Sequence, residues 1–448
     1  MTTVSAPPIA NQDRDRILDL YRRHVNRSSA TLCDLIGAPL HASSAGTKIY
    51  DPNGVEYLDC AGFGVNLIGH RHPAVIAAVK RQLDEQPLVS RPLIAPATAR
   101  AAAALAGVAP TGLDHVYLTN SGAEAVEVGI KPARLQGKTR IIAMRGGFHG
   151  KTMGALSVTG RHQYRTPFEP LLPGIEFGIF GDPEDLDRRL AQDGDKTLVL
   201  VEPILGEGGV RIPPVGWLSH VRRRCTEVGA MLMIDEIQTG LGRVGAWWAA
   251  DREQVVPDIL LAGKILSGGV VPVGAVLSTS RVFEPLDDDP MLHSSTFAGS
   301  PLAAAAVEAT IGVLKSEQLI ERSAELGREL LTMVREVTAE HCPDVVQEVR
   351  GSGLLIGIDF VAGDTAIEFL MALLERNVVP SYSLNGYNIL RLTPPATLDR
   401  ADVAFLRTAL EGAARELGRR PAFHRPAGQH HHTAAAQRPT QQEISCAS

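Results

Sequence analysis

The sequence predicts an α/β protein with a mostly parallel central sheet, followed by a smaller α+β domain. Between residues 115 and 277, short apolar runs alternate with amphipathic segments, and Gly, Pro or acidic residues bound most of the runs. Alternating strand and helix signals of this kind indicate βαβ units and therefore parallel strands. The chain has 448 residues, 44% of them hydrophobic, which is enough for a large core and more than one domain.

The strands of the predicted sheet are expected at the short apolar runs His115–Thr119, Arg140–Ala143, Thr197–Val201, Ala230–Ile234, Ile259–Ala262 and Val271–Leu277. One helix is expected to start at Gly122, and another to cover Val215–Val228 between two of these runs. Residues 71–310 would form this large domain. It would begin with two helices, at Pro73–Gln86 and Ala97–Ala106.

The two ends of the chain are expected to build the smaller domain together. In residues 1–70, a helix is predicted over Arg14–Leu32 and two strands on either side of the turn Asp51–Gly54. Residues 311–420 are predicted to add long helices and short strands, at Ile320–Glu340, Val345–Val349, Leu354–Phe360, Thr365–Arg376, Val378–Pro380, Asn388–Leu392 and from Arg400. Residues 421–448 lack apolar periodicity and are predicted to be a disordered tail.

Composition narrows the class of protein. The formal net charge is −6 with 21% charged residues, which does not favour nucleic acid or an anionic membrane as partner. The five cysteines are scattered, so neither a disulfide framework nor a metal site is expected. Because the N-terminus lacks the features of a signal peptide and no apolar run could span a bilayer, we expect a cytoplasmic protein.

Lys264 is the first candidate for chemistry. It follows the apolar run Ile259–Ala262 and one glycine, and it precedes Ser267-Gly268-Gly269. A partly buried amine at such a strand end has a depressed pKa and can form a Schiff base with an aldehyde. Taken alone the pattern is weak, since most lysines near glycines are simply exposed.

Three other motifs complement this lysine. The buried run 231–234 ends in Asp235 and Glu236, and a carboxylate there can hold a pyridinium nitrogen protonated. Ser121 and Gly122 stand between a strand and a helix, where backbone N–H groups can bind a phosphate. Phe148 lies on a glycine-rich loop and can stack on a planar ring. Each motif alone is equally compatible with an ordinary helix cap, turn or buried side chain.

One segment matches the motif of a different class of protein. Residues 240–245 match the dinucleotide-binding pattern G-x-G-x-x-G, but Trp247-Trp248 and Pro257 follow where a helix would be required. The dinucleotide interpretation is therefore set aside.

With these motifs in order, the sequence resembles the class III, ornithine-aminotransferase-like aminotransferases of pyridoxal-phosphate fold type I. The resemblance runs from about residue 46 to about residue 417. It is carried by NSGAEAVE (120–127), GGFHGKTMGALSVTG (146–160), VEPILGEGGV (201–210), IDEIQTGLGR (234–243), GK (263–264), STFAGSPLA (295–303) and RLTPP (391–395). It implies a large domain with a seven-stranded-type sheet, pyridoxal 5'-phosphate as cofactor, and a homodimer or larger assembly with shared active sites.

The resemblance also implies roles for single residues. Lys264 would bind the cofactor as a Schiff base and then act as general base, and Asp235 would pair with the pyridine nitrogen. The other cofactor contacts would be Gln238 to the ring hydroxyl, Phe148 to the ring face, Ser121, Gly122 and Ala123 to the phosphate, and Thr296 to the phosphate of the neighbouring subunit. Glu207 and Arg391 would form a switch pair, in which the arginine binds a substrate carboxylate and the glutamate otherwise neutralises it. Phe63, Val65 and Ser294 are candidates for the wall facing the substrate.

Lys151 departs from the pattern of many α-amino-acid users in the family, which carry arginine there. Lysine cannot reproduce a bidentate guanidinium–carboxylate contact. With Lys151 and the segments LDCAGFGVNLIGH (58–70) and GGVVPVGA (268–275), the sequence resembles the branch that contains bacterial putrescine aminotransferase. The expected function is therefore ping-pong transamination of a terminal amine such as putrescine or cadaverine with 2-oxoglutarate.

Several alternatives stay open at this point. One is the same chemistry on a specialised biosynthetic intermediate or a peptide terminus, and another is an acetylornithine-, ornithine- or 4-aminobutyrate-type omega-aminotransferase. An aminomutase or decarboxylating member of the family is a third. A protein that binds the cofactor without catalysis is the fourth, and the presence of Lys264, Asp235 and Gln238 argues against it.

Overall fold

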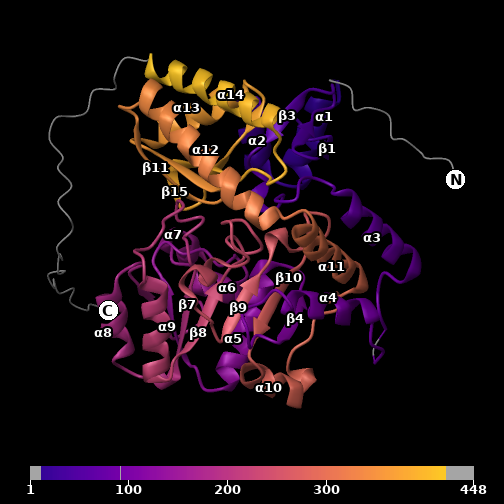
Figure 1. Cartoon of the computed structure of the whole chain (residues 1–448), viewed down its shortest axis with the longest axis vertical. Helices are drawn as coiled ribbons and strands as arrows, with labels where there is room; N and C mark the ends of the chain where they lie inside the picture. Colours follow the sequence, from indigo (N-terminus) through magenta and orange to yellow (C-terminus); the bar gives the residue numbers. More distant parts are fainter. Residues whose placement is uncertain (1–11, 91, 420–448) are drawn as a thin grey trace, which may run out of the picture.

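The computed structural model describes residues 12–90 and 92–419 and contains a seven-stranded sheet in the larger of two domains (Figure 1). The strand order is β4-β10-β9-β8-β7-β5-β6. Strands β5 to β9 pair in parallel, while β10 is antiparallel to both β4 and β9. The bounds are β4 His115–Thr119, β5 Arg140–Met144, β6 Ile175–Gly178, β7 Thr197–Val201, β8 Met231–Asp235, β9 Ile259–Ala262 and β10 Gly274–Ser278. The predicted α/β class with a mostly parallel sheet is confirmed.

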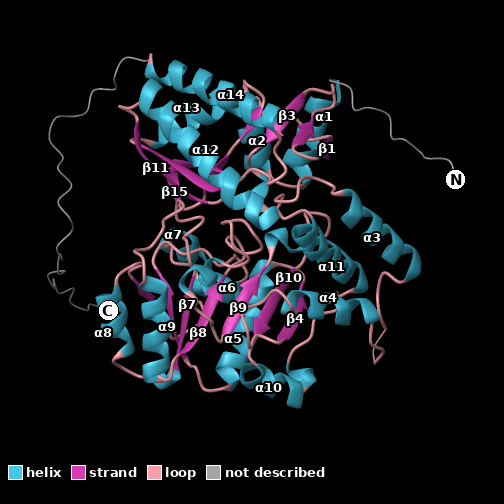
Figure 2. Cartoon of the chain, viewed as in Figure 1, coloured by secondary structure: helices cyan, strands magenta, loops and turns pink. Residues whose placement is uncertain are grey.

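Helices cover both faces of this sheet, which explains the uninterrupted apolar strands (Figure 2). Leu198 and Leu200 of β7 pack in one core with α5 (Gly122–Leu135) and α6 (Met153–Val158). Val199 and Val201 point the other way, into a core with α8 (Pro183–Leu190) and α9 (Trp217–Val228). Successive residues of a strand face opposite sides, so a strand buried on both sides must be apolar throughout.

Beside the β4 edge, α11 (Pro301–Ser316) packs against both α3 (Pro73–Glu85) and α4 (Pro96–Ala106). Alanines make this close packing possible, because Ala101 of α4 and Ala304 and Ala306 of α11 are fully buried. α10 (Ser280–Asp288) lies next to α5, and the short α7 (His162–Arg165) follows α6.

The second domain carries a four-stranded antiparallel sheet in the order β11-β12-β15-β14. Its bounds are β11 Val346–Ser352, β12 Leu355–Phe360, β14 Ser381–Ser383 and β15 Gly386–Leu392. Its helices are α12 Leu319–His341, α13 Gly363–Leu374 and α14 Arg400–Gly418. α12 contacts β11 and α14, while α13 contacts β15 and α14.

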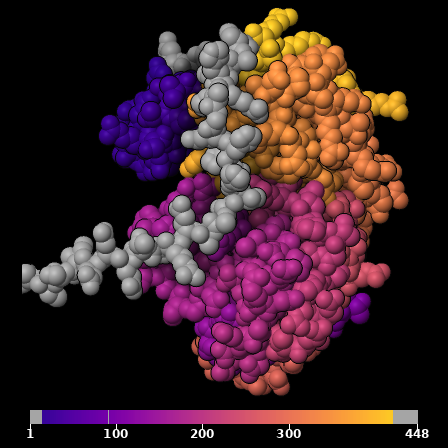
Figure 3. Space-filling model, turned by 90° about the vertical axis from the view of Figure 1, so that its left-hand side faces the viewer, coloured from indigo at the N-terminus to yellow at the C-terminus, as the bar shows by residue number. Residues whose placement is uncertain are grey.

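The two ends of the described chain meet in a third, mixed sheet. Strand β13 (Val378–Val379) pairs in parallel with β3 (Glu56–Asp59). On its other side β3 pairs antiparallel with β2 (Lys48–Tyr50), and β2 pairs antiparallel with β1 (Ser43–Ala45). Figure 3 shows the N-terminal segment in indigo and the C-terminal residues in orange and yellow at one end of the molecule. The exact domain boundaries stay predictions.

Some local expectations were wrong. The single helix expected over Arg14–Leu32 is two helices, α1 (Gln12–His24) and α2 (Arg27–Leu35), because Asn26 caps the second by accepting a hydrogen bond from Ser29 N. Several elements were not expected, namely β1, β6, α6, α7, α8, α10 and β14. The predicted tail, 421–448, lies outside the described residues. Among the helices that the structure describes, none is both long and apolar enough to cross a membrane.

Candidate active site

The site lies at the carboxyl ends of the central strands, where β8 ends in Asp235 and Lys264 follows β9 by two residues. A cavity of about 250 Å³ opens there. It is lined by Gly122, Ala123, Phe148, His149, Gly150, Glu202, Asp235, Ile237, Gln238 and Lys264. Six of the predicted cofactor residues therefore line one cavity, although they are spread over the sequence from Gly122 to Lys264.

Lys264 opens a short 3-10 helix, Lys264–Ser267, and has a φ of 42°. This left-handed conformation costs a residue with a side chain about 1–3 kcal/mol and is kept where the surroundings enforce it, often at functional sites. Burial lowers the pKa of Lys264, although the charges of Glu207 and Asp235 oppose the shift. A lowered pKa leaves more of the amine uncharged, as nucleophilic attack on an aldehyde requires.

Asp235 is buried, with 4% of its surface exposed, and its carboxylate is oriented from two sides. Oδ2 lies 2.7 Å from Nδ1 of His149, and Oδ1 accepts a hydrogen bond of 3.0 Å from the amide of Ile237. Burial works to lower the pKa of His149, but the hydrogen bond and the charge of Asp235 outweigh it, so the pKa is raised. The imidazole and the Ile237 amide thus fix the orientation of the Asp235 carboxylate.

Glu202 completes this buried cluster. Its two oxygens accept hydrogen bonds from Phe148 N (2.8 Å) and Gly206 N (3.1 Å). Burial raises the pKa of Glu202 to about 7, even though the charge of His149 works in the opposite direction. Glu202 therefore fixes the backbone of the loop that carries Phe148.

The predicted phosphate site is a helix N-terminus surrounded by close backbone. Ser121 caps α5 by accepting a hydrogen bond of 3.1 Å from Glu124 N. A Cβ at Gly150, whose φ is 122°, would lie 2.6 Å from the Cβ of Ala123. The first N–H groups of a helix have no partner within it, so this terminus can receive an anion.

Thr296 lies apart from this cavity. It is exposed on the loop that follows α10 and precedes α11, and the loop is held to the start of α5 by a hydrogen bond of 2.9 Å from Asn120 Nδ2 to Ser295 Oγ. Its predicted contact with a neighbouring subunit stays a prediction.

Glu207 and Arg391 form a buried ion pair, with 2.7 Å between Oε1 and Nη2. The side chains are 9% and 5% exposed. Within the described part of the chain, Nε and Nη1 of Arg391 have no hydrogen-bond partner although both are buried. Buried donors without partners cost free energy, and a bidentate carboxylate is the ligand that such a guanidinium fits.

Lys151 and Phe63, both predicted to face the substrate, are not among the residues that line the cavity. Nζ of Lys151 lies 4.7 Å from the ring centroid of Tyr164. Phe63 is 86% exposed and has a φ of 51°. The neighbouring Gly64 does approach the site, since a Cβ there would lie 3.8 Å from Cδ of Lys264.

Reasoning from the sequence missed His149, Glu202 and Tyr164. His149 and Glu202 belong to the motifs FHG and VEP, so a polar residue inside a conspicuous motif was the available signal. Tyr164 belongs to none of the quoted motifs, and the sequence around it contains no pattern that predicts its contacts.

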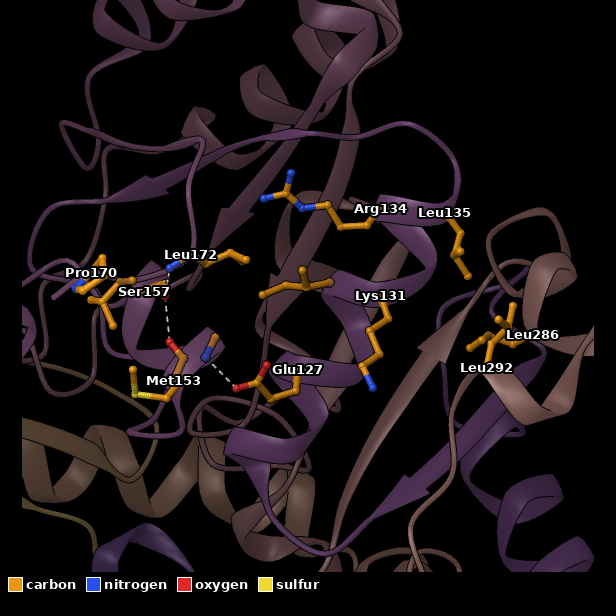
Figure 4. A pocket seen from close by; sticks show the side chains of 13 residues that line it. Glu127, Lys131, Arg134, Leu135, Met153, Ser157, Pro170, Leu172, Leu286 and Leu292 are labelled. Carbon is orange, nitrogen blue, oxygen red and sulfur yellow. Dashed lines mark hydrogen bonds between the residues drawn. The ribbon is translucent and has the colours of Figure 1, made fainter. Parts of the chain in front are cut away.

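A larger cavity of about 610 Å³ lies away from this cluster, between α5, α6, α10 and the loops that follow α7 and α10 (Figure 4). Its lining is mainly apolar, with Leu135, Leu172, Leu286 and Leu292. The carboxylate of Glu127 in this lining has a structural role, since it accepts hydrogen bonds from Gly154 N (2.7 Å) and Ala155 N (3.2 Å) at the start of α6. The smaller cavity, which contains the amine and its facing carboxylates, is therefore the candidate active site.

A mostly parallel seven-stranded sheet with a smaller domain, and a partly buried lysine that lines one cavity with a buried aspartate at the strand ends, define a pyridoxal-phosphate-dependent enzyme of fold type I. The sequence profile described as "Aminotransferase class-III" matches residues 39–413, which is most of the chain. The chain therefore belongs to the class III aminotransferase family and is a pyridoxal-phosphate-dependent transaminase.

Solved structures agree with this family. The ornithine aminotransferase from Toxoplasma gondii ME49 is 31% identical with a TM-score of 0.83, and the match covers 90% of this chain and 95% of that one. An (S)-enantioselective omega-transaminase from Thermomicrobium roseum is 27% identical with a TM-score of 0.83, over 90% and 98% of the two chains. A PLP-bound amine transaminase from an uncultivated Pseudomonas species is 28% identical with a TM-score of 0.79, over 85% and 95%.

Proposed function

We propose that this transaminase moves the amino group of a terminal primary amine, such as putrescine or cadaverine, to 2-oxoglutarate by a ping-pong mechanism. The observation that carries the proposal is the buried Glu207–Arg391 pair, whose charges act on Lys264. The guanidinium of Arg391 can be neutralised by Glu207 or can bind a substrate carboxylate. Such a group suits an enzyme whose two substrates differ in whether they carry a carboxylate at this position. Where many α-amino-acid users of the family carry a second arginine, this chain has Lys151, whose ammonium group lies over the ring of Tyr164.

The cavity residues fit the cofactor, because amine, carboxylates, helix N-terminus and aromatic side chain converge there. When bound, the cofactor supplies an aldehyde that captures the amine and a ring that withdraws electrons. Lys264 would bind it and then carry the proton between substrate carbon and cofactor, aided by its lowered pKa. Asp235, backed by His149, would hold a proton on the ring nitrogen.

The remaining roles follow from position and chemistry. Gln238 would contact the ring hydroxyl, and Phe148 would pack on the ring face. Ser121, Gly122 and Ala123 would hold the phosphate at the start of α5. Phe63 would border the substrate entrance, while Lys151 would support Tyr164 rather than bind substrate.

Arg391 and Glu207 would separate the two half-reactions. With an amine in the site, Glu207 neutralises Arg391 and leaves no charge uncompensated. With 2-oxoglutarate, the incoming carboxylate replaces Glu207 on the guanidinium, whose Nε and Nη1 are free to take it. A diamine needs no carboxylate clamp of its own.

The decisive measurement is a half-reaction. Purified holoenzyme is mixed with putrescine without keto acid, and the visible absorbance band of the cofactor is followed, with Lys264→Ala as the control. We expect the wild-type band to disappear and to return on addition of 2-oxoglutarate. The Lys264→Ala variant should show at least about a thousandfold slower change, since nucleophile and general base are lost together.

If putrescine leaves the band intact while glutamate removes it, the diamine assignment is wrong and transamination stands. If no amine or amino acid changes the band, the roles of Lys264 and the ion pair are wrong as well.

A second candidate is an omega-amine donor that also carries an α-carboxylate, of the ornithine type. The 31% identity to an ornithine aminotransferase favours it. Comparing putrescine with ornithine in the same half-reaction separates the two candidates, because only ornithine needs a carboxylate contact during the donor step.

The working form is proposed to be a homodimer in the cytoplasm. Large apolar side chains are exposed on the single chain, including Phe63, Ile94, Met291 and Phe297 at 86%, 87%, 78% and 62%. A surface of this kind is typical of subunit contacts. The cysteines that the structure describes are all free thiols, as in a reducing compartment.

A further inference from the structure

The turn between β14 and β15 holds Glu207 at three points. Ser383 Oγ and Asn385 N, the latter at 3.1 Å, both donate hydrogen bonds to the backbone carbonyl of Glu207. Leu384 N donates a hydrogen bond of 2.9 Å to Oε2 of its carboxylate. The backbone of Glu207 is therefore clamped, and its carboxylate has two partners, Arg391 on Oε1 and the Leu384 amide on Oε2.

Leu384 is itself held from the large domain by Tyr164. The phenol donates a hydrogen bond of 2.5 Å to the carbonyl oxygen of Leu384. The Tyr164 ring is covered in turn by two cations, Lys151 Nζ at 4.7 Å and Arg161 Cζ at 5.6 Å from its centroid. Figure 1 shows α7, which carries Tyr164, at the boundary between the two domains. The tyrosine thus fixes the peptide unit next to the amide that contacts Glu207.

This arrangement matters when Arg391 exchanges partners. A carboxylate substrate can bind the guanidinium fully only if Oε1 of Glu207 leaves it. Because the backbone of Glu207 is clamped, the exchange is a rotation of its side chain. The displaced carboxylate stays buried, and a buried carboxylate without a hydrogen-bond donor is strongly disfavoured. In the structure the Glu207 carboxylate has two partners, Arg391 and the Leu384 amide. After the exchange, only the Leu384 amide remains as its partner.

We propose that Tyr164 is a positioning residue for the carboxylate half-reaction: by fixing the Leu384 amide, it stabilises Glu207 while a substrate carboxylate occupies Arg391. The inference rests on the Glu207–Arg391 exchange of the proposed function. It makes Tyr164 and the turn at Leu384 determinants of the preference for carboxylate substrates over plain amines. It also gives Lys151 a function, as a cation that holds the tyrosine ring.

The test uses the holoenzyme and Tyr164→Phe, which keeps the ring and removes only the hydroxyl. Binding of glutarate, a dicarboxylate that cannot be transaminated, is measured by calorimetry. We expect the dissociation constant to rise by about 5- to 20-fold, as for loss of a hydrogen bond that supports a charged group. Enzyme loaded with pyridoxamine 5'-phosphate should show a similar rise in KM for 2-oxoglutarate, with the limiting rate retained.

Tyr387→Phe is the matched control. Tyr387 lies in the same hairpin, its ring faces Arg161 at 5.3 Å, and its hydroxyl accepts a hydrogen bond of 3.2 Å from Gln163. It is not among the residues that hold Glu207, so wild-type values are expected. Unchanged or tighter glutarate binding in Tyr164→Phe overturns the inference. Equal glutarate binding by wild type and Arg391→Gln instead rejects the Arg391 site of the proposed function, and the inference with it.

Discussion

At the scale of single residues, the site depends on carboxyl groups that the fold keeps away from water. Glu202 follows β7 and Glu236 follows β8, and burial raises the pKa of each to about 7. Both still accept backbone hydrogen bonds, Glu236 from Ala250 N at 2.8 Å. These hydrogen bonds work to lower the pKa, but the loss of hydration is the larger effect. Each group therefore takes up a proton more readily in the folded than in the unfolded chain.

Because of this shift, the free energy of unfolding should depend on pH, and Glu236→Gln should make that pH dependence smaller. The folded pKa is near 7 and the ordinary value is 4.5, so the folded state holds the extra proton between them. The stability contribution is complete below pH 4.5 and is lost as pH rises through 7. Glutamine can accept from Ala250 N and donate to the hydroxyl of Thr239, so it should not lose this stability at pH 8.

The measurement is urea unfolding of wild type and Glu236→Gln at pH 5.5 and pH 8. The variant should gain on the order of 1–3 kcal/mol relative to wild type between the two pH values. Parallel pH curves for the two proteins would show that Glu236 is not protonated in the folded state near neutral pH.

At the scale of elements, the cavity is formed by loops that approach one another so closely that only glycine fits at the points of contact. The loop after β5 crosses the start of α5 at Gly150, where a Cβ would meet Ala123 at 2.6 Å. A Cβ on Gly206, in the loop after β7, would lie 2.1 Å from Oε1 of Gln238. The shape of the proposed phosphate and ring sites therefore depends on backbone packing between loops.

Gly150→Ala tests this dependence. The added methyl group should push the loop away from α5, destabilise the fold by about 1–3 kcal/mol and weaken cofactor binding at least about tenfold. Gly112→Ala is the control, because Gly112 also has a positive φ, 95°, but nothing lies within 4 Å of its Cβ position. Titration of the two apoenzymes with pyridoxal phosphate compares them, and equal affinities would contradict the proposed role of this crossing.

At the scale of the whole molecule, the chain presents apolar side chains next to its own active-site loops. Ile94 precedes α4, and Thr98 in that helix donates a hydrogen bond of 2.7 Å to Gly299 O, near Thr296 and Phe297. This surface is the expected subunit contact, and it includes the residue proposed to reach the phosphate of the partner.

Ile94→Asp should therefore convert the dimer to monomer and lower cofactor affinity. In an isolated chain the change would be nearly neutral, within about 0.5 kcal/mol, because the side chain is 87% exposed. Val215→Asp, at a fully exposed valine, should leave the assembly intact. Light scattering after gel filtration measures the mass, and a dimeric Ile94→Asp protein would exclude this surface from the interface.

The fold class and the main site residues could be predicted from the sequence because their signals are local. Buried strands such as Ile259–Ala262 are apolar at every position, and this one is followed by a glycine-rich turn. The convergence of Lys264, Asp235 and Gly122 follows from the rule that parallel strands end at one edge. The break between α1 and α2 was missed because Asn26 acts as a cap, which competes with a continuous helical pattern.

The sequence by itself thus determined the α/β class, the family and most of the residues around the cavity. Only the tertiary structure decided how those residues are supported. His149 pairs with Asp235 across 86 positions, and Tyr164 reaches Leu384 across 220. Such contacts join loops that have no periodic pattern, and they form only after separate sheets and helices have packed. The chemical groups are therefore encoded locally, while their orientation and protonation depend on the folded arrangement.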